Sequence, residues 1–142
     1  MSEQIIQIAL QSTNGKYLSR IDRGNRNPIE ASKDAIDLPS RFTIKSSGSN
    51  RVVLLADNKM YLSRINRGEL NPIEAAKRKI DELSIFTVGY ISENKITLRA
   101  DNGYYLSRIY RDGISTIEAA KEQIDDECYF WITTIMSYDH GL

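Results

Sequence analysis

The chain has 142 residues, and its 19 Lys and Arg side chains are balanced by 19 Asp and Glu, so the formal net charge is zero. One domain is expected at this length. Neutrality argues against nucleic acid as a partner, because binding to it requires excess positive charge. No run of about 18 apolar residues is present that would predict insertion into a membrane.

One five-residue motif occurs three times along the chain. Tyr-Leu-Ser-Arg-Ile begins at Tyr17, Tyr61 and Tyr105, with a constant spacing of 44 residues. Three copies of one unit can close around an axis and can carry up to three equivalent sites. We therefore interpret residues 1–142 as a single domain of three repeats, at about 5–48, 49–92 and 93–136.

Each repeat has the pattern of four short strands. In the first repeat, Ile5–Leu10 is a β-branched and partly alternating stretch. Asn14-Gly15 follows, and this dipeptide is a strong hairpin signal because both residues tolerate positive φ. The motif beginning at Tyr17 is then the return strand, a polar loop follows it, and a closing strand begins at Phe42.

The segment after the polar loop has two interpretations. Pro28–Ile36 taken alone is typical of a short helix with proline at its first position. The third repeat, however, has Thr116 in place of the proline, and the segment is too short to be stable as an isolated helix. We expect a third strand at Ile29–Ala31, followed by a turn or a single helical turn over Lys33–Asp37.

Twelve strands in three equal repeats predict an all-β fold, a β-trefoil with pseudo-threefold symmetry. Six strands would form a closed barrel and three hairpins would cap one end, which leaves no exposed sheet edge. A three-bladed propeller falls below the usual number of blades. Repeated apolar residues are expected to form core layers of three, namely Leu10/Leu54/Leu98, Leu18/Leu62/Leu106, Ile36/Ile80/Ile124 and Phe42/Phe86/Phe130.

Two known families show similar motifs. Gly15-Lys16-Tyr17-Leu18-Ser19, a later Ile-Glu-Ala-Ser strand and a closing Phe-Thr-Ile resemble the hairpin pattern of fascin-like β-trefoils. The stretch Asp37–Phe42 is loosely similar to the Asp-Pro turn and closing Phe of amaranthin-type plant agglutinins. The resemblance spans all three repeats and implies a trefoil that is either a lectin or an actin-binding module. The glutamine-any-tryptophan signature of ricin-like lectins is missing.

We expect no enzyme, no metal and no cofactor. A single histidine, His140, cannot supply a repeated catalytic triad, and Asp125-Asp126-Glu127 lacks the ligand spacing of a calcium loop. The only cysteine, Cys128, stands where the other repeats have Ser40 and Ser84, so we expect a small buried side chain. The amino terminus lacks the regions of a signal peptide. A cytoplasmic protein is therefore expected, or one released by a route without a signal peptide.

The loop after each Tyr-Leu-Ser-Arg-Ile strand is the candidate binding region. Its carboxylates, amides and guanidinium groups match the paired donors and acceptors of sugar hydroxyls, and Tyr110 can cover the apolar face of a pyranose. The same Asn, Gly and Pro residues are also ordinary turn formers. The candidate ligand-binding residues are Asp22, Arg23, Asn25, Asn27, Asn66, Arg67, Glu69, Asn71, Tyr110, Arg111 and Asp112.

The favoured function is a lectin with up to three glycan sites, whose partners are glycans or glycoproteins and whose repeated sites gain avidity. A homodimer is possible. The alternatives are a fascin-like actin-binding module and a protease inhibitor. Asn27 and Asn71 are expected in exposed turns. Four charged positions are identical in all repeats and are expected to form salt bridges between units. They are Arg20/Arg64/Arg108, Glu30/Glu74/Glu118, Lys33/Lys77/Lys121 and Asp37/Asp81/Asp125.

Overall fold

The computed structural model describes the backbone of residues 3–140 and the side chains of residues 5–135. Each repeat has four strands, with a short 3-10 turn before the fourth. The first repeat contains β1 (Glu3–Gln11), β2 (Tyr17–Arg20), β3 (Ile29–Lys33), η1 (Leu38–Ser40) and β4 (Phe42–Ser46). The second contains β5 (Arg51–Leu55), β6 (Tyr61–Arg64), β7 (Ile73–Lys77), η2 (Glu82–Ser84) and β8 (Phe86–Ser92). The third contains β9 (Lys95–Arg99), β10 (Tyr105–Arg111), β11 (Ile114–Lys121), η3 (Asp126–Cys128) and β12 (Phe130–His140).

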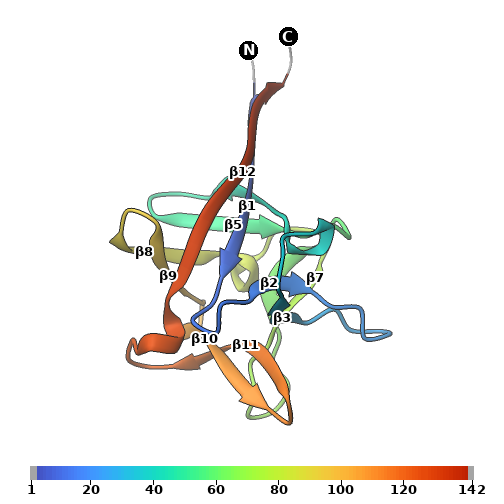
Figure 1. Ribbon diagram of the computed structural model, residues 1–142, viewed down its shortest axis with the longest axis vertical. Helices are drawn as coiled ribbons and strands as arrows, with labels where there is room; N and C mark the ends of the chain where they lie inside the picture. Colours follow the sequence, from blue (N-terminus) through green and yellow to red (C-terminus); the bar gives the residue numbers. More distant parts are fainter. Residues whose placement is uncertain (1–2, 141–142) are drawn as a thin grey trace.

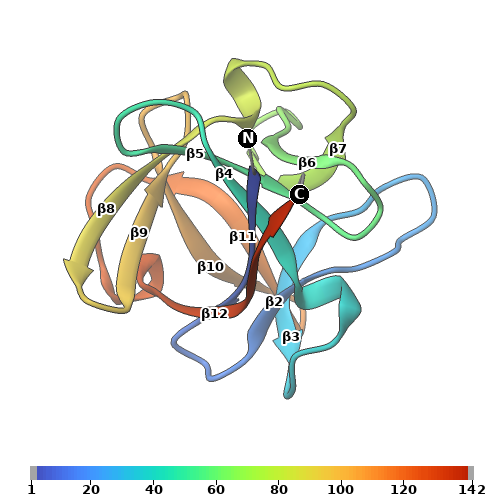
Figure 2. The same cartoon turned by 90° about the horizontal axis from the view of Figure 1, so that it is seen from above.

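Six of these strands close into an antiparallel barrel. The pairing runs from β1 to β4, β5, β8, β9 and β12, and β12 returns to β1. The β1–β12 ribbon continues beyond the barrel, so the two ends of the described chain lie side by side (Figure 1). Figure 2 shows the three repeats arranged around the barrel. The all-β trefoil predicted from the repeat is therefore confirmed.

The remaining strands form three hairpins, β2–β3, β6–β7 and β10–β11, that cover the other end of the barrel. Neighbouring hairpins touch through single bridges between repeats, Pro28 with Glu74 and Pro72 with Glu118, while Thr116 pairs with Glu30 across the third junction. These bridges bring the loops of all three repeats around the same axis.

The strand interpretation of Ile29–Ala31 is confirmed, and the helical alternative is wrong. The helical turn lies later than expected, at Leu38–Ser40 instead of Lys33–Asp37. Lys33 is still paired with Tyr17 in the sheet, so the chain turns only afterwards. The Ser40 hydroxyl then accepts a hydrogen bond from the Asp37 amide at 2.8 Å and closes the turn.

Cys128 occupies the corresponding place in the third repeat and is fully buried, as expected. Burial raises the pKa of its thiol, which therefore stays protonated and packs as a small side chain.

Three of the four expected core layers are confirmed, and the layer of Ile36, Ile80 and Ile124 is wrong. Ile80 and Ile124 are 46% and 40% exposed, because the chain has already left the hairpin and runs over the surface at this point. Their place in the core is taken by one isoleucine of each third strand, which is no more than 1% exposed. These residues are Ile29, Ile73 and Ile117.

Of the four repeated charged positions, all of which lie among the described residues, the arginines alone form salt bridges between units, and they do so at two of the three junctions. The expectation is wrong for the glutamates, which pair with arginines of their own repeats. Arg20 of the first repeat pairs with Asp57 of the second, and Arg64 pairs with Asp101. The repeated lysines instead pair within their own repeats, as in Lys33 with Asp37. No helix within residues 3–140 is long and apolar enough to cross a membrane.

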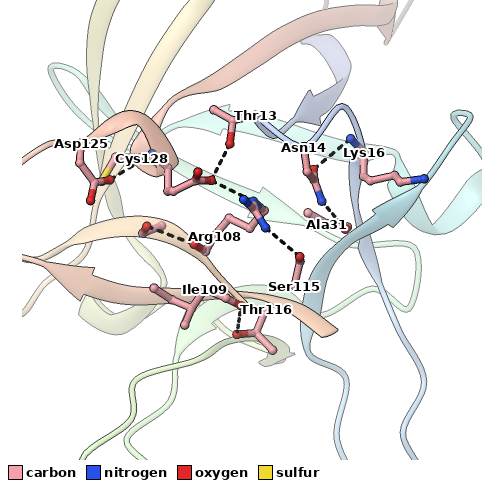
Figure 3. A network of polar contacts seen from close by, with 12 residues as sticks. Thr13, Asn14, Lys16, Ala31, Arg108, Ile109, Ser115, Thr116, Asp125 and Cys128 are labelled. Carbon is pink, nitrogen blue, oxygen red and sulfur yellow. Dashed lines mark hydrogen bonds and ion pairs between the residues drawn. The ribbon is translucent and has the colours of Figure 1, made fainter. Parts of the chain in front are cut away.

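The third junction uses a different network (Figure 3). Arg108 pairs with Glu127 of its own repeat at 2.9 Å. The guanidinium group of Arg108 also donates a hydrogen bond to the Ser115 hydroxyl at 3.1 Å. Thr13 of the first repeat donates a hydrogen bond to Glu127 at 2.5 Å, which joins the first repeat to the third. Burial raises the pKa of Glu127, but hydrogen bonds from Thr13 and Arg108 outweigh it and leave the pKa below its ordinary value.

Candidate ligand-binding site

The arginine of each candidate loop is bound to a buried glutamate of the same repeat. In the first repeat, Arg23 donates from Nε to Oε2 of Glu30 at 2.6 Å and from Nη2 to Oε1 at 2.9 Å. The same fork recurs between Arg67 and Glu74 and between Arg111 and Glu118. Two parallel hydrogen bonds fix both the position and the plane of each guanidinium group.

The carboxylates of these pairs are only 3–4% exposed. Burial raises the pKa of Glu118, but hydrogen bonds from Arg111 and Thr116 outweigh it and leave the pKa below its ordinary value. The Thr116 hydroxyl donates at 2.6 Å, a contact that the prolines of the other two repeats cannot make. The hydrogen bond to Glu118 in turn raises the pKa of Arg111.

The three Arg–Glu pairs surround one cavity of about 460 Å³ at the hairpin end of the barrel. We call it the axial pocket, because all three repeats contribute equivalent residues to its wall. Polar groups come from the three pairs, from Arg26 and from Thr116. Apolar groups come from the third strands and the loop tips, namely Pro28, Ile29, Leu70, Pro72, Ile114 and Ile117. A volume of this size is typical of small-molecule sites.

Only three of the candidate residues line the axial pocket, and these are Arg23, Arg67 and Arg111. Asp22 instead accepts a hydrogen bond from the Gly24 amide at 3.0 Å and shapes the loop. The other exposed candidates lie outside the pocket wall. They are Asn25, Asn66, Glu69, Tyr110 and Asp112.

The expectation of exposed turns at Asn27 and Asn71 is wrong. Both side chains are half-buried, and each Oδ1 accepts a hydrogen bond from an arginine, Asn27 from Arg20 at 2.7 Å and Asn71 from Arg64 at 2.6 Å. The Asn27 carbonyl also accepts from the amide of Ala75 in the next repeat. These asparagines therefore help to join neighbouring repeats, because Arg20 and Arg64 also form ion pairs with aspartates of the next repeat.

Sequence reasoning assigned the repeated glutamates a structural role and missed them as wall residues of a pocket. One signal was present: an arginine precedes a glutamate by seven residues in every repeat, as Arg23 precedes Glu30. Among the described residues, no group of three His, Cys, Asp or Glu side chains is arranged to hold a metal ion.

A second set of hollows lies on the barrel wall, where repeats meet. A cavity of about 340 Å³ lies at the junction of the second and third repeats, and Arg51, Thr87 and Arg99 form part of its lining. A smaller one of about 180 Å³ occupies the equivalent place between the first and second repeats. At the third junction the exposed ring of Trp131 and the ring of Tyr129 lie beside the ammonium group of Lys95, 5.4 and 4.5 Å from it.

The closed barrel, the three capping hairpins and the threefold repetition of the wall residues define a β-trefoil protein. No family model matches the chain, and no curated protein matches its sequence. Solved structures do match. ThreeFoil, a designed threefold-symmetric protein, superposes with a TM-score of 0.77 at 12% identity, over 91% of this chain and 99% of that one.

Two natural proteins with larger chains are also similar. A Polyporus squamosus lectin bound to the epitope Neu5Aca2-6Galb1-4GlcNAc matches with a TM-score of 0.72 at 11% identity, over 92% of this chain and 48% of the lectin. The exo-beta-1,3-galactanase 1,3Gal43A from Clostridium thermocellum matches with a TM-score of 0.76 at 11% identity, over 92% of this chain and 30% of that one. These likenesses confirm the trefoil fold. They do not confirm the fascin-like or amaranthin-type family.

Proposed function

We propose that this trefoil is a non-enzymatic carbohydrate-binding protein, a lectin, and that its glycan lies in the axial pocket. The observation that carries the proposal is the convergence of three Arg–Glu pairs on one cavity with apolar walls. The largest apolar pocket with a few convergent polar groups is the first place to expect a ligand. The structural likeness to the Polyporus lectin supports a sugar as that ligand.

The chemistry of the wall suits a sugar ring. The described contacts of Arg23, Arg67 and Arg111 use Nε and Nη2, and each Nη1 carries two further N–H donors. Each paired carboxylate keeps lone pairs that can accept a hydroxyl proton. Apolar C–H groups of a pyranose can pack on Leu70 and Ile114, which are accessible in the wall. The charges of the three Arg–Glu pairs cancel, and Arg26 adds one positive charge at the wall.

The same geometry implies one axial site for each chain instead of three separate loop sites. All three candidate arginines face one cavity, so a ligand in the pocket would contact all three repeats at once. Glycans and glycoproteins remain the proposed partners.

A glycan array on the purified protein tests the proposal, and a pair of Leu→Trp variants locates the site. Leu70→Trp should fill the axial pocket and abolish binding to the glycans that the array identifies. Leu38→Trp is the matched control, because Leu38 is also exposed but lies outside the axial pocket. Both variants should melt near the wild-type temperature.

Three results would contradict the proposal. An array without hits would remove the lectin function. Normal binding by Leu70→Trp would remove the axial site. Release of new reducing ends from a bound oligosaccharide would show that the protein is an enzyme.

A further inference from the structure

The barrel wall carries a row of three side chains at each junction between repeats. Partners on neighbouring strands lie roughly 4.8 Å apart and point to the same side of the sheet. The rows occupy equivalent positions in the threefold repeat, yet their chemistry differs. They are Gln7–Thr43–Leu55, Arg51–Thr87–Arg99 and Lys95–Trp131–Gln11. Only the row between the second and third repeats places two cations on either side of a hydroxyl group.

This row lines the cavity of about 340 Å³ described above, which we call the arginine crevice. Two carboxylates also line it, and one of them, Asp101, is already bound at both oxygens by Arg64, at 2.7 and 3.0 Å. Neither Arg51 nor Arg99 forms an ion pair with any side chain in residues 5–135. Glu82 is then the only other carboxylate lining the crevice, so the crevice has one excess positive charge.

Arg99 is held in place before any ligand arrives. Its Nε donates to the Gly103 carbonyl at 3.0 Å, and its guanidinium carbon lies 5.7 Å from the centroid of the Tyr105 ring. A side chain oriented in this way loses less entropy when it binds an anion through its terminal nitrogens.

We infer that the arginine crevice is a second glycan subsite, selective for an acidic group, a carboxylate or a sulfate, held between Arg51 and Arg99. Guanidinium groups match the two oxygens of such an anion. The Thr87 hydroxyl, between the two arginines, supplies a third donor. The inference rests on the proposed lectin function in one respect, namely that a sugar carries the anion.

The test compares two sugars that differ only at C6. Methyl β-glucuronide carries a carboxylate there, and methyl β-glucoside carries a neutral hydroxymethyl group. In 15N-labelled full-length protein, the glucuronide should shift the amide resonances of Arg51, Thr87 and Arg99 in a saturable way. The glucoside should leave these resonances in place at the same concentration. The amide of Leu70 reports the axial pocket in the same spectra, so failure of one site is distinguished from failure of the other.

Removing a positive charge from the crevice should weaken glucuronide binding, and removing a negative charge should strengthen it. Arg51→Gln and Arg99→Gln should each weaken it by at least about tenfold, the effect of losing one hydrogen bond to a charged group. Glu82→Gln should strengthen it, because it removes the opposing charge. Arg78→Gln is the matched control, since Arg78 is exposed and lies outside the crevice. Added salt should weaken binding to the wild type.

Several outcomes would overturn the inference. Equal shifts with glucoside and glucuronide would remove the selectivity for an acidic group. Unchanged affinity in Arg51→Gln and Arg99→Gln would place the anion elsewhere. Shifts with inorganic sulfate but none with the glucuronide would show a simple anion site that takes no sugar.

Discussion

Arg20 of the first repeat forms a two-point ion pair with Asp57 of the second, with Nε 2.6 Å from Oδ1 and Nη2 3.0 Å from Oδ2. Both side chains are largely buried at the junction, 16% and 10% exposed. The equivalent pair at the next junction is Arg64 of the second repeat with Asp101 of the third. The third junction has no such pair among the described residues, because Thr13 occupies the position of the aspartate where the third repeat meets the first. The barrel is therefore closed by a different network at the junction that joins the chain ends.

The Arg20–Asp57 pair predicts a specific loss of stability in acid. The hydrogen bond from Arg20 holds the pKa of Asp57 below its ordinary value of 3.8. A carboxyl group with a lowered folded-state pKa stabilises the fold above its ordinary pKa, and the contribution is lost as the pH falls through the folded value. Asp57→Asn should therefore lower the urea midpoint at neutral pH and flatten its decline below about pH 4. Asp126→Asn, which removes an exposed carboxylate outside the described ion pairs, is the control. A decline as steep as that of the wild type in Asp57→Asn would contradict the prediction.

Two isoleucines of the second repeat test the revised core layer. Ile73 is fully buried, whereas Ile80 is 46% exposed. Ile73→Ala should lower the free energy of unfolding by about 2–5 kcal/mol, because it leaves a cavity in the core. Ile80→Ala makes the same chemical change on the surface and should cost about 1 kcal/mol or less. Denaturant unfolding measures both, and equal losses would show that the layer is assigned incorrectly.

Asn27 is expected to stabilise the junction between the first two repeats. Asn27→Ala removes the acceptor of an Arg20 hydrogen bond at 2.7 Å and should cost about 1–2 kcal/mol. Asn25→Ala, two residues earlier in the exposed part of the loop, should change stability by no more than about 0.5 kcal/mol. Thermal and urea unfolding of the two variants should separate them clearly. Similar stabilities would mean that the Arg20 contact contributes little.

Lys59 has a backbone conformation that favours glycine. Its φ is +67°, and the equivalent residues of the other repeats, Gly15 and Gly103, have φ of +80° and +84°. A left-handed conformation costs a residue with a Cβ roughly 1–2 kcal/mol, while glycine loses part of this advantage through chain entropy. Lys59→Gly should therefore raise the free energy of unfolding by about 0.5–1 kcal/mol. The reciprocal change Gly15→Lys should lower it, and a loss of stability in Lys59→Gly would count against the argument.

The number of bound glycans is the fifth prediction. Since the three candidate arginines line one axial pocket, calorimetric titration with a neutral monovalent glycan should give about one site per chain. Two or three sites of similar affinity would favour the separate loop sites expected from the sequence.

Much of the fold could be predicted from local patterns in the sequence. The 44-residue period, the Asn-Gly turns and the alternating β-branched stretches report the backbone geometry directly, and together they led to twelve strands and a trefoil. The Leu and Phe layers followed for the same reason, since each lies in or beside a strand with a clear inward face. Ile36 was misplaced because its inward direction depends on where β3 ends, and the neighbouring sequence predicts that boundary only loosely.

The sites were decided by the tertiary structure. Arg23, Arg67 and Arg111 lie 44 residues apart along the chain, and only the bridges between hairpins bring them around one pocket. Arg51 and Arg99 meet across Thr87 because the barrel register sets β5, β8 and β9 side by side. A repeat in the sequence determines that equivalent residues will be related by an axis. Whether they face that axis, solvent or one another depends on strand register and on contacts between distant segments, which no local pattern encodes.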